Sequence, residues 1–169
     1  NKEARQLLAD TYTQLGYQAE SGPWRNFYLT GARDLFKKDV PYTSQLINDG
    51  VLAQMDMGTL LDYCAIQLNG KKAAGKEAVI NINFTDTKEK VMLMLNNEVL
   101  NHRLDSQDKK ADLTLEIAKM DFVKLFFGRT DLQTLLKTNK VRTTGNTKAM
   151  EVICSAYEPA DPNFKIVLP

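Results

Sequence analysis

Few side chains in this chain are of the kinds that catalysis or metal binding requires. The 169 residues include one histidine, His102, and two cysteines, Cys64 and Cys154. A binuclear zinc site needs several histidine and carboxylate ligands, because each ion takes three or four nitrogen, sulfur or oxygen donors. His102 lies in the middle of a predicted strand, on the face that carries Leu100 and Leu104, where a structural role is the ordinary one. We therefore predict no catalytic residue and no metal site in this chain.

The two cysteines are too few for a disulfide framework. Cys64 falls on the same helical face as Leu60 and Leu68, and Cys154 follows Ile153. Free cysteine is among the most buried residue types and packs there as a small hydrophobe. We predict that both are buried free thiols.

Arg25 and Asn26 could contact an anion. A guanidinium fork matches sulfate as well as phosphate or carboxylate, and both residues lie just inside a predicted helix N-terminus, which favours negative charge. The alternative is that Arg25 pairs with a carboxylate while Trp24 packs against another part of a longer protein. We favour this alternative, because structural ion pairs are the commoner explanation.

An apolar ligand is the other chemistry that the residue types allow. Unbranched methionine adapts to irregular apolar surfaces, so a ligand tunnel would use it, and a tightly packed core would use the same side chains as gap fillers. The pattern alone does not separate these two interpretations. The candidate residues are Met92, Met94, Met120, Phe122, Phe126, Met150 and Ile153.

The composition excludes several classes of protein. Hydrophobic residues make up 43% of the chain and charged residues 25%, which is typical of a folded globular protein. The net charge of +1, without a basic stripe, disfavours nucleic-acid binding. No apolar run approaches the roughly 18 residues of a membrane span. The chain opens within a helical pattern and without an initiator Met, so we expect a fragment of a longer protein and read no compartment from its N-terminus.

The N-terminal pattern predicts a helical hairpin. Apolar residues at helical spacing indicate a helix from about 2 to 20, the break Ser21-Gly22-Pro23 ends it, and a second helix continues to about 36. A lone helix pair cannot bury its apolar face, so Trp24, Phe27 and Tyr28 need a partner. We divide the chain into this hairpin (1–37), a connector (38–54) and a second domain (55–169).

The second domain has the pattern of an α+β fold. A helix is predicted from Asp56 to Leu68, and period-2 alternation then indicates strands at 78–84, 91–95, 99–104 and 111–117. Because the links are short, we expect these strands to be antiparallel in sequence order. Two short helices, a strand at 141–144 and a helix at 147–157 follow. The prediction is a five-stranded, mainly antiparallel sheet covered by helices.

Four motifs occur in order along the chain. Ala4–Ala32 ends in Gly-Pro-Trp-Arg-Asn-Phe-Tyr-Leu and a Thr-Gly-Ala tripeptide, Leu60–Gly70 reads LLDYCAIQLNG, Asn96–Arg103 reads NNEVLNHR, and Phe126–Gly145 carries Gly128 and the Lys140-Val141 strand start. The first resembles the end of the helical dimerisation region of the zinc-dependent alkyl sulfatases, which belong to the metallo-β-lactamase superfamily. The others resemble their C-terminal domain, which is similar to sterol carrier protein 2. Cys64, in place of a larger apolar residue, and Asn139-Lys140, in place of a glycine turn, depart from the pattern.

The resemblance implies a parent protein with a binuclear zinc hydrolase domain, a dimerisation domain and this C-terminal domain. The parent would cleave sulfate from primary alkyl sulfates as a homodimer, and the family suggests a bacterial periplasmic or secreted location. This chain, without a cofactor of its own, would have two partners: the missing catalytic domain and the long alkyl chain of the substrate. The apolar candidates would line a surface or tunnel for that chain, and Arg25 and Asn26 would face the sulfate.

Two rival interpretations belong to other classes. A free-standing lipid carrier would use the same second domain, but it does not need the run from Trp24 to Ala32. An enzyme in its own right is disfavoured by the small number of possible metal ligands.

Overall fold

The computed structural model describes residues 1–36 and 48–159, which belong to two separate compact units. We describe each unit by itself. The end of the predicted hairpin at Lys37, residues 38–47 of the predicted connector and the C-terminal residues 160–169 lie outside the described part.

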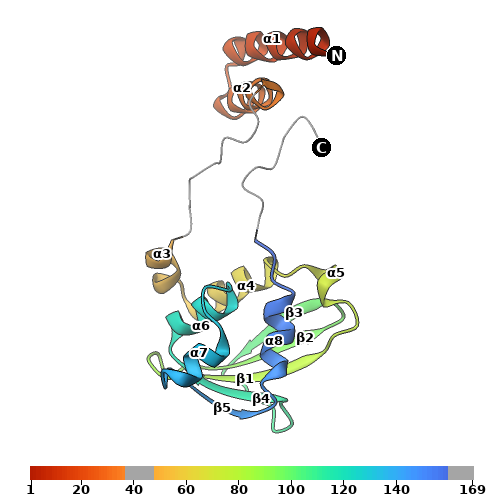
Figure 1. The fold of residues 1–169 in the computed structure, drawn as a ribbon. Helices are drawn as coiled ribbons and strands as arrows, with labels where there is room; N and C mark the ends of the chain where they lie inside the picture. The colour runs from red at the N-terminus through yellow and green to blue at the C-terminus, as the bar shows by residue number, and fades with distance from the viewer. Residues whose placement is uncertain (37–47, 160–169) are drawn as a thin grey trace. The chain divides into compact units, whose positions relative to one another are not determined.

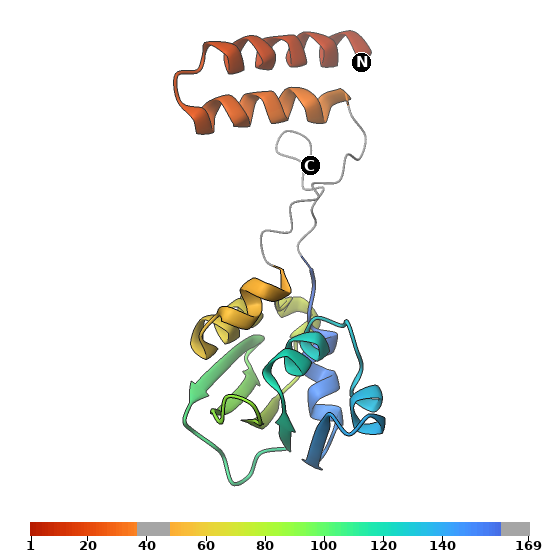
Figure 2. The same ribbon diagram turned by 90° about the vertical axis from the view of Figure 1, so that its left-hand side faces the viewer.

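The first unit is the predicted helical hairpin, formed by α1 (Lys2–Gln18) and α2 (Gly22–Phe36), which run side by side in opposite directions (Figures 1 and 2). The Asn1 side chain caps α1 by accepting a hydrogen bond from the Glu3 amide at 2.9 Å. Ala9 and Gly16 of α1 and Ala32 and Leu35 of α2 are buried. These residues form a small core of their own, in which short side chains allow a close approach of the two helices.

The second unit is built on a five-stranded sheet with the strand order β3-β2-β1-β4-β5. Its strands are β1 (Ala78–Phe84), β2 (Lys90–Asn96), β3 (Val99–Leu104), β4 (Leu113–Ile117) and β5 (Val141–Gly145). The predicted α+β class and mainly antiparallel sheet are confirmed. The expected sequence order of the first four strands is wrong, because β4 pairs with β1, in parallel, and not with β3.

The parallel pair exists because the link between β3 and β4 returns across the sheet instead of turning back beside β3. The buried Asn81 side chain of β1 holds this link in place. Its amide nitrogen donates to the Asp108 carbonyl at 2.8 Å, and its amide oxygen accepts from the Asp108 backbone amide at 3.0 Å. Asp112 then joins the start of β1, since its carboxylate accepts from the Val79 amide at 2.8 Å.

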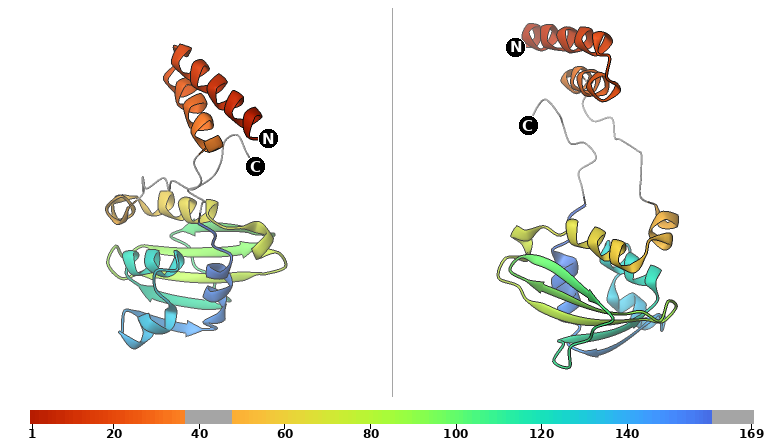
Figure 3. Two further views of the ribbon diagram at one scale, coloured as in Figure 1. Left: turned by 45° about the horizontal axis from the view of Figure 1, so that its top comes forward. Right: turned by 180° about the vertical axis from the view of Figure 1, so that it is seen from behind.

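Helices cover one face of the sheet, as Figures 1 and 3 show for α4, α6 and α8. Alternate residues of each strand point into the core between the sheet and these helices, so that Ile80, Leu93 and Leu115 are fully buried. The helices are α3 (Asp49–Gln54), α4 (Met57–Ile66), α5 (Gly70–Ala73), α6 (Lys119–Phe126), α7 (Leu132–Lys137) and α8 (Lys148–Ser155).

Helix α3 occupies residues for which the sequence indicated a connector. Its Leu52 side chain is buried in the core of the second unit. The Asn48 side chain caps α3 by accepting from the Val51 amide at 3.1 Å. Asn48-Asp49-Gly50 indicated a turn, and the structure uses Asn48 as a helix N-cap, because the same residue types favour both.

Candidate functional site

His102 lies on β3 and faces the helix-covered side of the sheet. Its Nδ1 atom is 3.8 Å from Oδ1 of the exposed Asp62 on α4. Within residues 1–36 and 48–159, no three His, Cys, Asp or Glu side chains gather so that they could hold a metal ion. The described residues therefore do not fit a zinc centre of the kind that the sequence resemblance implies for a parent protein.

The two cysteines lie on different helices of the second unit and are both free. Cys64 of α4 is fully buried, whereas Cys154 of α8 is partly exposed and its Sγ lies 3.7 Å from the Leu125 carbonyl. Burial raises the pKa of each thiol to about 12. Both therefore stay protonated at ordinary pH and contribute as small apolar groups rather than nucleophiles.

Arg25 binds the backbone of its own hairpin. Its Nη2 atom donates to the Ala19 carbonyl at 3.3 Å, which ties α2 to the end of α1. Asn26, the next residue of α2, is exposed. A role of these two residues toward a sulfate group stays a prediction.

The sheet separates the predicted apolar candidates into two groups. Met92 and Met94 pair with Asn81 and Val79, so they lie on the face opposite the helices. Phe122 and Phe126 of α6 and Met150 and Ile153 of α8 are buried in the core between the helices and the sheet, and Met120 of α6 is half-buried beside them. One alkyl chain therefore cannot contact both groups without crossing the sheet.

The buried group continues toward the surface through aromatic rings that we did not single out from the sequence. Phe127, which ends α6, lies 5.3 Å from Phe126 between ring centroids, and Tyr157, which follows α8, lies 6.0 Å from Phe126. Tyr63 of α4 lies 5.7 Å from Phe127. All three of these additional rings are partly exposed. The proximity of these rings depends on long-range packing. Only Phe126 and Phe127 could have been paired from the sequence, because they are adjacent in the chain.

The hairpin carries an aromatic face on α1 and α2, which we define as Tyr12, Trp24, Phe27 and Tyr28. Tyr28 stacks between Tyr12 and Trp24, with ring centroids 6.0 and 5.8 Å away. Trp24 is 57% exposed and Phe27 is 43% exposed. Contiguous exposed apolar surface of this kind marks interaction sites.

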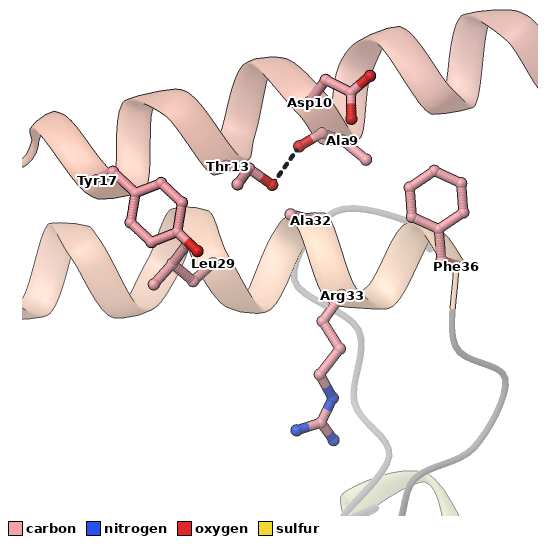
Figure 4. Close-up of a pocket in the computed structure, with 8 residues that line it drawn as sticks. All are labelled: Ala9, Asp10, Thr13, Tyr17, Leu29, Ala32, Arg33 and Phe36. Carbon is pink, nitrogen blue, oxygen red and sulfur yellow. Dashed lines mark hydrogen bonds between the residues drawn. The ribbon is translucent and has the colours of Figure 1, made fainter.

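A groove of about 440 Å³ runs along the same hairpin between different side chains (Figure 4). Ala9 and Ala32 lie in its middle, and Tyr17 and Phe36 stand toward its two ends. Asp10 and Arg33 also line it, so its rim is charged. None of its lining residues belongs to the aromatic face. The hairpin therefore offers two distinct surfaces.

Every helix among the described residues is too short or too polar to cross a membrane.

Comparisons with known proteins agree on one relationship for the whole chain. Residues 45–169 match the family described as alkyl sulfatase C-terminal, and residues 1–38 match the family described as alkyl sulfatase dimerisation. A linear primary-alkylsulfatase from Pseudomonas sp. is 37% identical over 171 residues, and an (R)-specific secondary-alkylsulfatase from Pseudomonas sp. is 35% identical over 175 residues. Both matches cover 100% of this chain but only 25% of the relative.

A solved structure shows the same relationship. The stereoselective inverting sec-alkylsulfatase from Pseudomonas sp. is similar with a TM-score of 0.86 and 33% identity, over 99% of this chain and 26% of that one. The chain thus spans about a quarter of the length of these relatives.

Proposed function

This chain belongs to the alkyl sulfatase family, and from that premise we propose that it is the non-catalytic C-terminal part of such an enzyme. In this proposal its α+β domain binds the hydrophobic alkyl chain of the substrate, and its helical hairpin supports assembly of the enzyme. The observation that carries the proposal is the match of both parts of the chain to alkyl sulfatase families at the dimerisation and C-terminal regions.

We assign hydrolysis of the sulfate ester to the part of the parent that lies outside this chain. Zinc-dependent hydrolysis needs a set of three or more protein ligands around each ion, and no such group forms among the described side chains. Both thiols stay protonated at ordinary pH, and His102 is the single histidine of the chain. These residues support a role in binding rather than in bond cleavage.

The core of the α+β domain supports the proposed alkyl binding. An apolar region that joins α4, α6 and α8 reaches the surface through the partly exposed rings of Phe127 and Tyr157. An alkyl chain buried there would gain about 0.8 kcal/mol for each methylene removed from water, less what the chain loses in freedom. Binding should therefore depend mainly on chain length and little on the head group.

The hairpin supports the proposed assembly. Its aromatic face carries Trp24 and Phe27 in exposed positions, and the family matched by residues 1–38 is that of alkyl sulfatase dimerisation. We propose that the parent enzyme is a homodimer and that this hairpin contributes to its interface.

Titration calorimetry of the 169-residue chain with straight-chain alcohols and alkyl sulfates of increasing length tests the binding proposal. We expect the affinity to rise with each methylene and to level off once the site is full. Alkyl sulfates should bind without release of sulfate. A flat or absent response over the series would contradict alkyl binding, and sulfate release by the isolated chain would contradict a non-catalytic role.

A further inference from the structure

We propose that a single alkyl chain enters the α+β domain beneath Tyr157 and lies along the rings of Phe127 and Phe126. The Tyr157 ring then acts as the gate of the site. This inference rests on the proposed alkyl binding. It assigns the binding to one place in the domain, whereas the sequence indicated a broader set of apolar candidate residues.

A row of aromatic rings joins the sheet to the surface at this place. Phe84 at the end of β1 contacts Phe122 at 5.6 Å between centroids, and Phe122 contacts Phe126 at 6.1 Å. Beyond Phe126, the rings of Phe127 and Tyr157 contact each other at 5.3 Å. Exposure rises along the row, since Phe122 and Phe126 are fully buried and Phe127 and Tyr157 are not. An alkyl chain that lay along this row would replace contacts between neighbouring rings with contacts between its methylene groups and those rings.

The segment that carries Tyr157 closes the outer end of the row. Tyr157 forms an isolated bridge with Leu68. On either side of it, the Asn69 amide donates to the Ala156 carbonyl at 2.8 Å, and the Glu158 amide donates to the Gln67 carbonyl at 3.0 Å. Two backbone hydrogen bonds therefore join the closing segment 156–158 to residues 67–69, and two more join it to the end of α8.

The polar side-chain contacts of the segment add little to this attachment. Glu158 accepts a hydrogen bond from the Asn69 side chain and forms an ion pair with Lys72 at 3.3 Å. Both partners of the ion pair are about half exposed, and ion pairs in that setting contribute little net stability. Opening segment 156–158 breaks these bonds and separates the Tyr157 ring from Phe126 and Phe127, but it leaves the core helices packed. Elements held by fewer contacts are the ones that open first.

The groups behind Tyr157 are small and apolar. Ala156 and Cys64 are fully buried, and the Cys154 thiol contacts the Leu125 carbonyl. Burial keeps both thiols neutral by raising the pKa of each to about 12. No described buried side-chain nitrogen or oxygen lacks a hydrogen-bond partner, so no unsatisfied buried polar side chain awaits an alkyl chain here.

The polar end of the ligand would stay outside, beside Arg129. The positive charge of Arg129 acts to lower the pKa of the Tyr157 hydroxyl, against the larger effect of burial, which raises it. Arg129 follows Phe127 by two residues in the chain, and it is already paired with Asp49. A guanidinium that is already paired in this way adds little to the affinity for an anionic head group. The expected ligand is therefore an unbranched alkyl chain whose polar end is neutral or anionic.

A single-tryptophan reporter tests the location. The chain has one tryptophan, Trp24, so Trp24→Phe together with Phe127→Trp places the only indole beside the gate. Titration with dodecanol should shift the emission of this reporter to shorter wavelength and should saturate. The matched control, Trp24→Phe with Leu7→Trp at an exposed position of α1, should not shift.

Stopped-flow mixing of the Phe127→Trp reporter with dodecanol tests the gate. Adding Tyr157→Ala removes two ring contacts, and their ordinary strength corresponds to an association rate about tenfold faster. Adding Tyr157→Phe keeps the ring and should leave the rate unchanged, as should Ile66→Ala at an exposed position of α4. Circular dichroism of each variant establishes that it is folded, and the reporter titration tests the location even if Tyr157→Ala does not fold.

The outcomes separate this inference from the proposed function. If calorimetry shows that dodecanol binds the unmodified chain while the Phe127→Trp emission does not change, the site lies elsewhere and alkyl binding stands. If the emission changes but Tyr157→Ala leaves the association rate unchanged, Tyr157 is not the gate and the inference falls in that part. If the unmodified chain binds no alcohol of any length, both the inference and alkyl binding fall.

Discussion

Gly16 of α1 packs directly against Leu29 of α2. A Cβ atom built on Gly16 would lie 2.7 Å from Leu29 Cδ2 and 2.8 Å from Leu29 Cγ, closer than carbon atoms approach without repulsion. The two helices can be this close only because residue 16 has no side chain.

Replacing Gly16 with alanine should destabilise the hairpin, although alanine is the better helix former. The gain in helix propensity is about 1 kcal/mol, and the overpacking of a tight contact costs about 1–3 kcal/mol. We expect the steric cost to win, because Leu29 Cγ as well as its terminal methyl is in the way. Hydrogen exchange of the α1 amides should become faster. Gly22→Ala is the control, since nothing lies within 4 Å of a Cβ there; equal effects of the two substitutions would contradict the packing argument.

Asn81 should contribute strongly to the stability of the α+β domain. Its buried side chain makes both hydrogen bonds to the backbone of Asp108, and Asn81→Ala leaves those two backbone groups without their partner. We expect a loss of about 1–3 kcal/mol in the free energy of unfolding, measured by urea denaturation. Asn83→Ala is the matched control, because Asn83 is half-buried and its side chain bonds only the Gln107 side chain in this link. A loss as large in the control would mean that Asn81 has no special role.

Stability of the α+β domain should fall in acid partly through two helix caps. Asp56 and Asp131 accept hydrogen bonds from the side chain and backbone amide of Thr59 and Thr134, and these bonds lower the pKa of each carboxyl. A carboxyl whose pKa is lower in the folded state binds fewer protons there than in the unfolded chain. Its contribution is present above the unfolded value of about 3.9 and is lost as the pH falls through the lower folded value.

Thermal unfolding of cap variants as a function of pH measures this effect. Asp56→Asn keeps a capping side chain and removes its titration, so its melting temperature should fall less steeply below pH 4 than that of the unmodified chain. Asp56→Ala should melt lower throughout the neutral range. Identical pH profiles for the unmodified chain and Asp56→Asn would show that this cap does not contribute to acid unfolding.

Local patterns in the sequence were enough to predict the strands and most of the helices, but not α3 or α5. They also did not predict every pair of neighbouring elements. Period-2 alternation located β1 and β2, and it already placed Met92 and Met94 opposite Leu93, since successive residues of a strand face opposite sides. Treating both methionines as part of one site with Phe122 overlooked that consequence. The contact of Tyr157 with Phe127 had no local signal, because it depends on the pairing of Tyr157 with Leu68. The link that leads to the parallel β4 is likewise held by the Asn81 side chain, and a side-chain contact with a distant loop produces no periodic pattern in the sequence.

The aromatic face of the hairpin should mediate self-association of the isolated chain. Its Trp24 ring is more than half exposed in the single chain and is the only indole present, so its fluorescence reports directly on this face. As the protein concentration rises, we expect the Trp24 emission to shift to shorter wavelength together with an increase in sedimentation coefficient, because association removes the ring from water. Phe27→Glu places a charge beside Trp24 and should abolish both changes. Leu7→Glu, at an exposed position of α1 outside the aromatic face, should abolish neither. If the chain associates with Trp24 still exposed to water, the aromatic face is not the interface.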